Sequence, residues 1–141
     1  MAEFTIALGG NVGDTERFMQ TALKMLEAGG ARISAFAAPM RSAPDGCAPG
    51  TPDFLNSAAA GEFDGTPEQL LDLCQKIERE LGRPAAHGHN TPRTIDLDII
   101  TFGGLVRSTT RLTLPHPRAK QRRFVMDPLR EILKELPSEL R

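Results

Sequence analysis

The chain has few cysteines and no long apolar segment, and each absence excludes a class of protein. Its 141 residues contain only Cys47 and Cys74, which provide neither a disulfide framework nor a CxxC metal motif. No stretch approaches the roughly 18 apolar residues that a membrane span needs. The first ten residues lack the basic and apolar regions of a signal peptide. We therefore expect one cytoplasmic domain over residues 1–141, monomeric, with reduced thiols and no membrane partner.

A net excess of charge is also absent, but the charges are unevenly distributed. The chain has 17 Lys and Arg against 18 Asp and Glu, which gives a net charge of -1. Residues 79–123 hold nine basic and three acidic side chains, a local charge of +6, and all three histidines. Such a segment fits either a partner rich in negative charge, such as phosphate, or a solvated basic face.

The order of apolar, glycine and proline residues predicts alternating strands and helices. A capping box of Thr66 and Gln69, with Pro67 between them, marks a helix start, and Gly9-Gly10-Asn11 is interpreted as a tight turn after the first strand. The order βαββαβ is that of a ferredoxin-like α+β fold with short C-terminal additions. The expected elements are strand 4–8, helix 15–28, strand 33–38, loop 41–52, strand 54–63, helix 67–81, loop 83–92, strand 94–102, strand 112–114 and helix 124–136.

Two aspartates in the strand TIDLDII are the central chemical feature. Asp96 and Asp98 are two residues apart, so both carboxylates project from one face of the strand. Ile95, Leu97 and Ile99 then face the core. Adjacent carboxylates repel unless a cation lies between them, and Mg²⁺ is held by one or two carboxylates together with substrate phosphates. The alternative is an exposed strand face whose carboxylates pair with arginines.

Residues near this pair in the sequence indicate which ligand such a site would take. Arginines at 83, 93, 118, 122 and 123 have the planar guanidinium groups that bind phosphate oxygens. Phe54 and Asn56 share one face of a strand start, where a ring and an amide could stack on and hydrogen-bond to a flat heterocycle. A core phenylalanine and a turn asparagine are the simpler interpretation of that second pair.

Together these segments resemble the 6-hydroxymethyl-7,8-dihydropterin pyrophosphokinase family of folate biosynthesis. The resemblance spans the chain through ALGGNVGD, PDFLN, IERELGR, PRTIDLDII and LPHPRAKQRRFVMDPL. It implies a ferredoxin-like α+β fold and transfer of pyrophosphate, as one unit, from ATP to the pterin hydroxymethyl oxygen, with release of AMP. It also implies two Mg²⁺ ions as cofactors. The implied partners are ATP and the hydroxymethyl dihydropterin rather than nucleic acid.

The resemblance further implies a role for each matching residue. Asp96 and Asp98 match the carboxylates that hold the metal ions, and Arg83 and Arg93 join them in catalysis. Phe54 and Phe124 match the aromatic pair that sandwiches the pterin. The other implied pterin contacts are Ser42, Pro44, Asp45, Gly46 and Asn56. The implied nucleotide contacts are Gln75, Glu78, Arg83, Arg93, Ile99, His116 and Arg122.

The chain also departs from the family's pattern. His89-Asn90-Thr91 stands where an Arg-Trp-Gly-like segment is usual, Ala85 replaces a residue that is often basic, and Asp45 replaces an apolar residue. These changes imply a less well sealed site and weaker ATP binding. Two other functions stay open. The first is a protein that binds these ligands without turnover. The second is a single-stranded nucleic-acid module, although this chain lacks the aromatic strand motif typical of such modules. A water, a phosphate oxygen or Asp98 is the candidate general base.

Overall fold

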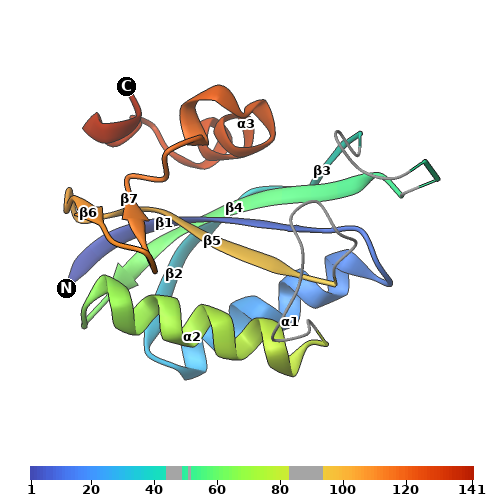
Figure 1. Cartoon of the computed structure of the whole chain (residues 1–141), viewed down its shortest axis with the longest axis horizontal. Helices are drawn as coiled ribbons and strands as arrows, with labels where there is room; N and C mark the ends of the chain where they lie inside the picture. Colours follow the sequence, from blue (N-terminus) through green and yellow to red (C-terminus); the bar gives the residue numbers. More distant parts are fainter. Residues whose placement is uncertain (44–48, 51, 83–93) are drawn as a thin grey trace.

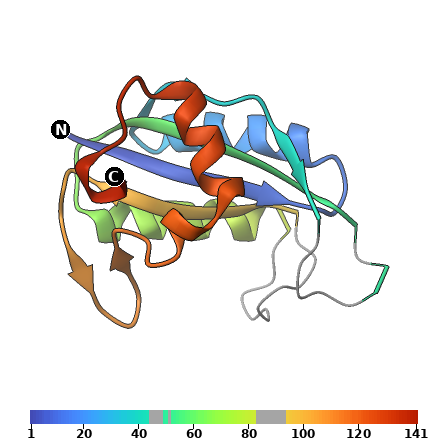
Figure 2. The same ribbon diagram turned by 90° about the horizontal axis from the view of Figure 1, so that it is seen from above.

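A computed structural model describes residues 1–43, 49–50, 52–82 and 94–141, which form three layers (Figure 1). The middle layer is a five-stranded antiparallel sheet of order β2-β4-β1-β5, with β3 paired to β4. Helices α1 and α2 cover one face of this sheet, and α3 crosses the other face (Figure 1 and Figure 2). The elements are β1 (Ala2–Gly10), α1 (Thr15–Ala28), β2 (Ala31–Phe36), β3 (Met40–Ser42), β4 (Phe54–Phe63), α2 (Pro67–Glu80), β5 (Asp96–Phe102), β6 (Arg107–Ser108), β7 (Thr113–Leu114) and α3 (Arg123–Ile132), with 3-10 turns at Ala119–Gln121 and Ser138–Leu140.

The predicted α+β class and the βαββαβ order are confirmed, and the local signals explain where the helices begin. The Thr66 hydroxyl accepts from the Gln69 amide at 3.1 Å, and the Gln69 side chain accepts from the Thr66 amide at 2.9 Å. This capping box satisfies two donors that the first turn of α2 would otherwise leave without partners. The apolar stripe of α2 then faces the sheet and buries Cys74 and Ile77. Among the described residues, no helix is both long enough and apolar enough to cross a membrane.

Several expected boundaries were wrong, and those of the strands depend on pairing between segments that are distant in the sequence. The first strand continues past Leu8 through Gly10, since Gly9 pairs with Asn56 on one side and Asp96 on the other. Residues 40–42, placed at the edge of an expected loop, form β3 against the start of β4. The second strand covers 31–36 rather than 33–38, β6 adds a strand that was not predicted, and α3 ends at Ile132 rather than at 136. The 83–92 loop lies outside the described residues.

Side chains alternate along β5 up to a register shift against β1, and this alternation determines which of them face which layer. Before the shift, Leu97 pairs with Leu8 and Ile99 with Ile6, and these side chains join the core beneath α1 and α2. Ile100 is on the same strand face as Asp96 and Asp98 and packs beneath α3, and the register shift that follows returns Phe102 to the core beneath the helices. The start of β5 therefore presents Ile95, Leu97 and Ile99 to one core, as predicted, and its two aspartates to the side that α3 covers.

Gly10 fixes how closely the end of β1 approaches the segment that leads into β5. A Cβ atom at this position would lie 2.4 Å from the Thr94 carbonyl oxygen, a backbone atom that cannot rotate away. We expect Gly10→Ala to lower the free energy of unfolding by about 1–3 kcal/mol, the usual cost of overpacking, as measured by urea denaturation. A Cβ at the neighbouring Gly9 would lie 3.3 Å from the movable Asn56 Oδ1, so Gly9→Ala is the matched control. Equal losses in the two variants would contradict this account.

Candidate active site

Asp96 and Asp98 occupy the start of β5 and point toward the N-terminal end of α3. Both carboxylates line a small cavity of about 40 Å³, together with Asn56 from β4 and Phe124 from α3. β1 contributes Ala7, Leu8 and Gly9 to the wall, and α3 also contributes Val125. The predicted placement of both carboxylates on one strand face is confirmed, and the site adds an aromatic ring and an amide beside them.

A buried carboxylate on α2 holds the backbone between the two aspartates. β5 is the edge strand of its sheet, and the Leu97 amide donates to Glu78 Oε2 at 2.8 Å. Glu78 is only 9% exposed. A buried amide without a partner costs about 1–3 kcal/mol, so this bond fixes the strand where Asp96 and Asp98 begin. Glu78, predicted as a nucleotide contact, thus also fixes the main chain that carries the candidate metal ligands Asp96 and Asp98.

Burial, assisted by two of these carboxylates, keeps a neighbouring thiol inert. Burial, then Glu78 and Asp98, raise the pKa of the Cys74 thiol far above its ordinary value. A thiol held in its neutral form is a poor nucleophile and a poor metal ligand. Cys74 is therefore a core residue beneath the site, which agrees with its predicted place on a helix.

A second cavity, of about 260 Å³, lies on the other side of Asp98. Its apolar walls come from α2, β5 and the β6–β7 hairpin, and His116 contributes a polar edge. Asp98 lines both cavities, so the two adjoin at this carboxylate. The lining residues are Leu71, Leu97, Asp98, Ile99, Arg111, Leu112, Thr113, His116 and Pro117.

Ile99 reaches this second cavity through its main chain. Its side chain is 3% exposed and belongs to the core beneath the helices. Main-chain groups of antiparallel strands alternate in direction, and the Leu97 amide points off the free edge toward Glu78. The N–H and C=O of Ile99, two residues later, therefore point off the same edge. The predicted nucleotide contact at Ile99 corresponds to one donor and one acceptor at the wall of this cavity.

His116 stands at the boundary between the free edge of β5 and the basic turn that precedes α3. Its amide donates to the Ile100 carbonyl at 2.9 Å, and its Nδ1 accepts from the Arg118 amide at 3.3 Å. Burial, followed by the positive charge of Arg122, lowers the pKa of His116, while Asp96 opposes the shift. An imidazole whose Nδ1 accepts carries its proton on Nε2, so His116 offers a neutral donor.

Arg111 is the site residue that the sequence interpretation missed. It lines the larger cavity, and its Nη2 lies 2.6 Å from Asp72 Oδ1 and 3.4 Å from Gln75 Oε1. Gln75, predicted as a nucleotide contact, accepts from Arg111 and is not among the described residues that line this cavity. Local sequence gave no signal for this arrangement, because it depends on the β6–β7 hairpin folding back onto α2.

The aromatic and amide residues predicted to hold a heterocycle are brought together only in part. Phe124 is 42% exposed, and the Arg122 guanidinium carbon lies 5.5 Å from its ring centroid. The Asn56 amide donates to Ser42 Oγ at 2.6 Å, which links β4 to β3 beside the smaller cavity. Phe54 pairs with Ser42 and is not among the described residues that line that cavity. Pro44, Asp45, Gly46, Arg83 and Arg93 lie outside the described residues.

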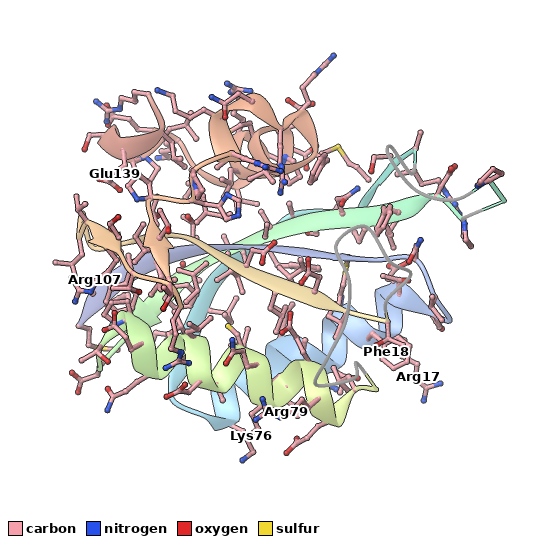
Figure 3. All side chains as sticks on the ribbon, viewed as in Figure 1. Arg17, Phe18, Lys76, Arg79, Arg107 and Glu139 are labelled. Atoms are coloured by element: carbon pink, nitrogen blue, oxygen red, sulfur yellow. The ribbon has the colours of Figure 1, made fainter. Side chains whose placement is uncertain are left out.

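The basic segment is not concentrated at the site as a whole. Arg79 projects from the side of α2 that faces away from the sheet, and Arg107 lies at the opposite end of the molecule from the start of β5 (Figure 3). His116, Arg111 and Arg122 remain beside the two cavities. The local charge of +6 therefore divides into a part that lies away from the candidate site and a part that faces it.

The donor set at the aspartates fits one kind of metal ion. In residues 1–43, 49–50, 52–82 and 94–141, no three His, Cys, Asp or Glu side chains form a group that could hold a metal. An all-protein zinc or calcium site needs more ligands than a carboxylate pair supplies. Mg²⁺ is commonly held by one or two carboxylates with phosphate oxygens and waters, so Asp96 and Asp98 fit Mg²⁺ bound jointly with a phosphate ligand.

Comparison with known proteins points to one family. The family model described as 7,8-dihydro-6-hydroxymethylpterin-pyrophosphokinase matches residues 5–134. The chain is 37% identical over 137 residues to the 2-amino-4-hydroxy-6-hydroxymethyldihydropteridine pyrophosphokinase of Methylorubrum extorquens, a match that covers 96% of this chain and 85% of that protein. The Bacillus subtilis protein of the same name is 37% identical over 135 residues, covering 95% and 80% of the two chains.

The chain also matches part of larger proteins. It is 38% identical over 131 residues to the mitochondrial folate synthesis bifunctional protein of Pisum sativum, and the match covers 93% of this chain. It spans only 25% of that protein, and 23% of the mitochondrial bifunctional protein of Arabidopsis thaliana.

The environment of His116 predicts its titration. We expect a pKa below the ordinary value of 6.5, and we expect Arg122→Gln to raise it, because that substitution removes a nearby positive charge. The folded state then resists a proton that the unfolded state accepts, so stability present above pH 6.5 is lost as the pH falls through the folded pKa. NMR titration of the imidazole resonances measures the shift directly. A pKa at or above 6.5 in the parent chain would contradict the assigned environment.

Proposed function

The chain belongs to the 7,8-dihydro-6-hydroxymethylpterin-pyrophosphokinase family, and we propose that it transfers pyrophosphate from ATP to the hydroxymethyl group of 6-hydroxymethyl-7,8-dihydropterin in folate biosynthesis. The hydroxymethyl oxygen attacks the β-phosphorus, and the bond from that phosphorus to the α,β-bridging oxygen breaks. The products are the pterin diphosphate and AMP, which keeps the bridging oxygen. The cytoplasmic location and monomeric state expected from the sequence are part of this proposal.

The observation that carries the proposal is the position of Asp98, one of the aspartate pair, between two cavities. Asp98 lines both, and the smaller cavity also contains an aromatic ring and an amide. A reaction between two small molecules needs both reactants held against one charged centre in a defined geometry. The paired carboxylates, with Asp98 at the junction, supply that centre, because the phosphate groups of ATP and their metal ions would lie between the nucleoside and the pterin.

Asp96 and Asp98 would hold Mg²⁺, with two ions expected from the family resemblance. Bound there, the metal would neutralise charge on the triphosphate and help to align it. The protein fixes the carboxylates through the strand, and Glu78 fixes the strand through the Leu97 amide. Arg122 adds positive charge on the same side, next to His116 and Phe124. Arg83 and Arg93 extend this role in the proposal, as the resemblance implies.

The larger cavity is proposed to hold the nucleotide. Its apolar walls suit a flat purine, and the N–H and C=O of Ile99 at its edge form a donor and acceptor pair. Adenine presents the matching pattern, an acceptor at N1 and a donor at N6. Arg111 and the neutral His116 are the polar residues that would contact the rest of the nucleotide.

The smaller cavity is proposed to hold the reactive end of the pterin. The Phe124 ring offers a stacking surface, and Arg122 lies over that ring. The Asn56 amide donates one N–H to Ser42, and its Oδ1 is the atom that would accept from a pterin N–H. Phe54 and residues 44–46 complete the pterin contacts in the proposal. The proton from the hydroxymethyl group passes to water, to a phosphate oxygen or to Asp98.

Product analysis tests this function. With ATP, Mg²⁺ and 6-hydroxymethyl-7,8-dihydropterin, we expect equal amounts of AMP and pterin diphosphate, measured by chromatography and ³¹P NMR. ADP in place of AMP would reject pyrophosphoryl transfer and indicate an ordinary kinase. Binding of both substrates without AMP would reject the enzyme and favour the binding protein. Asp96→Asn and Asp98→Asn should each lower kcat on the order of 100-fold or more, whereas the control Asp127→Asn, on the ion-paired surface of α3, should match the parent.

The Ile99 edge predicts selectivity for the base. Guanine reverses the pattern of adenine, with a donor at N1 and an acceptor at O6, so both hydrogen bonds to Ile99 would be lost. A site that pairs polar groups rejects a ligand that leaves them without partners. We expect kcat/KM for ATP to exceed that for GTP by at least about tenfold, in assays of pterin diphosphate formation. Equal values would place the base elsewhere.

A further inference from the structure

Two ion pairs fasten the β6–β7 hairpin to α2. Arg107 Nε lies 2.9 Å from Glu68 Oε2, and Arg111 Nη2 lies 2.6 Å from Asp72 Oδ1. Glu68 and Asp72 are four residues apart on α2, so they lie on one face of the helix, one turn from each other. The hairpin therefore meets α2 at two similar points, one at each of its arginines.

Of these two arginines, Arg111 is the one among the described residues that line the 260 Å³ cavity. Arg111 lines the 260 Å³ cavity with Asp98, Ile99 and His116, whereas Arg107 is not among the described residues that line it. Arg107 lies at the far end of the hairpin, away from the start of β5 (Figure 3). The two pairs are therefore alike in chemistry and differ in whether their arginine can meet a ligand.

The contacts of Arg111 leave most of its donors available. Its Nη2 donates to Asp72 and, at 3.4 Å, to Gln75. No described residue accepts from its Nε or Nη1, so three of its five N–H groups remain for a ligand. Asp72 thus holds the guanidinium at one corner and leaves the other donors beside the cavity.

Holding an arginine in place favours binding because a free arginine loses much rotamer freedom when a ligand orders it. Ordering such a side chain weakens affinity by about 2- to 12-fold. The side chains of Arg111 and Asp72 are 51% and 63% exposed, and ion pairs this exposed add little to fold stability. A contribution of Asp72 would therefore be visible in ligand affinity rather than in unfolding.

We propose that Asp72 is a positioning residue for the nucleotide: it preorganises Arg111 at the wall of the nucleotide cavity, and the neighbouring Glu68–Arg107 pair has no such role. The inference rests on the proposed function, since it takes the larger cavity to be the nucleotide site. It assigns to an exposed carboxylate on α2 an effect on ATP affinity without direct contact between Asp72 and ATP.

Titration calorimetry with Mg²⁺ and α,β-methylene ATP tests the proposal without requiring turnover. Asp72→Ala should weaken binding of the analogue about 3- to 10-fold and leave the melting temperature unchanged. Asp72→Asn, which keeps an acceptor for Nη2, should recover part of this loss. The matched control Glu68→Ala removes the other ion pair of the same hairpin and should bind within twofold of the parent. In turnover assays, Asp72→Ala should raise KM for ATP and leave kcat and KM for the pterin unchanged.

A double substitution separates positioning from a general effect of charge. Arg111→Met removes the group that Asp72 is proposed to hold, so adding Asp72→Ala to it should weaken the analogue no further. Full additivity would overturn the proposal, as would parent-like binding by Asp72→Ala or an equal loss in Glu68→Ala. No binding of the analogue by the parent would overturn it too. A parent that binds the analogue but makes no AMP would reject the proposed function alone, because binding and product formation are measured separately.

Discussion

The constraint on which the rest of the structure depends is the placement of two carboxylates side by side on the edge strand of a sheet. Asp96 and Asp98 must project together because strand side chains alternate, and like charges this close oppose each other. Glu78 brings a third carboxylate to the same strand, where it accepts from the Leu97 amide. This part of the molecule therefore concentrates negative charge against a fixed backbone, which is the arrangement that a cation with phosphate ligands would relieve.

The sheet places these carboxylates in a site with two adjoining cavities. Alternation along β5 places Ile99 in one core and Ile100 in the other, on the same side as the aspartates beneath the start of α3. The free edge of β5 is then used by site residues, since Glu78 takes the Leu97 amide and His116 donates to the Ile100 carbonyl. Between those two bonds, the main chain of Ile99 faces the larger cavity. The proposed positions of the metal ions, the base and the reactive end of the pterin thus all lie beside one short strand.

What the sequence predicted and what it missed have a common physical explanation. The period of two in TIDLDII and the capping box at Thr66 depend on neighbours in the chain, and the structure confirms the strand face and the helix start. Three other features depend on contacts between residues far apart in sequence. They are the pairing of β3 with β4, the extension of β1 to Gly10 and the ion pair of Arg111 with Asp72. Roles for Asn56, Phe124 and His116 came from family resemblance. The structure places all three at the cavities, and their chemistry stays a proposal.

The central claim is that Asp96 and Asp98 form the point where metal and nucleotide meet. A crystal structure of the chain grown with Mn²⁺ and α,β-methylene ATP tests it most directly, because anomalous scattering locates the metal independently of the protein atoms. The account predicts anomalous peaks within coordination distance of both carboxylates and of the nucleotide phosphates, with the base in the cavity beside Ile99. Mn²⁺ bound away from these aspartates, or a nucleotide whose phosphates lie far from them, would contradict it.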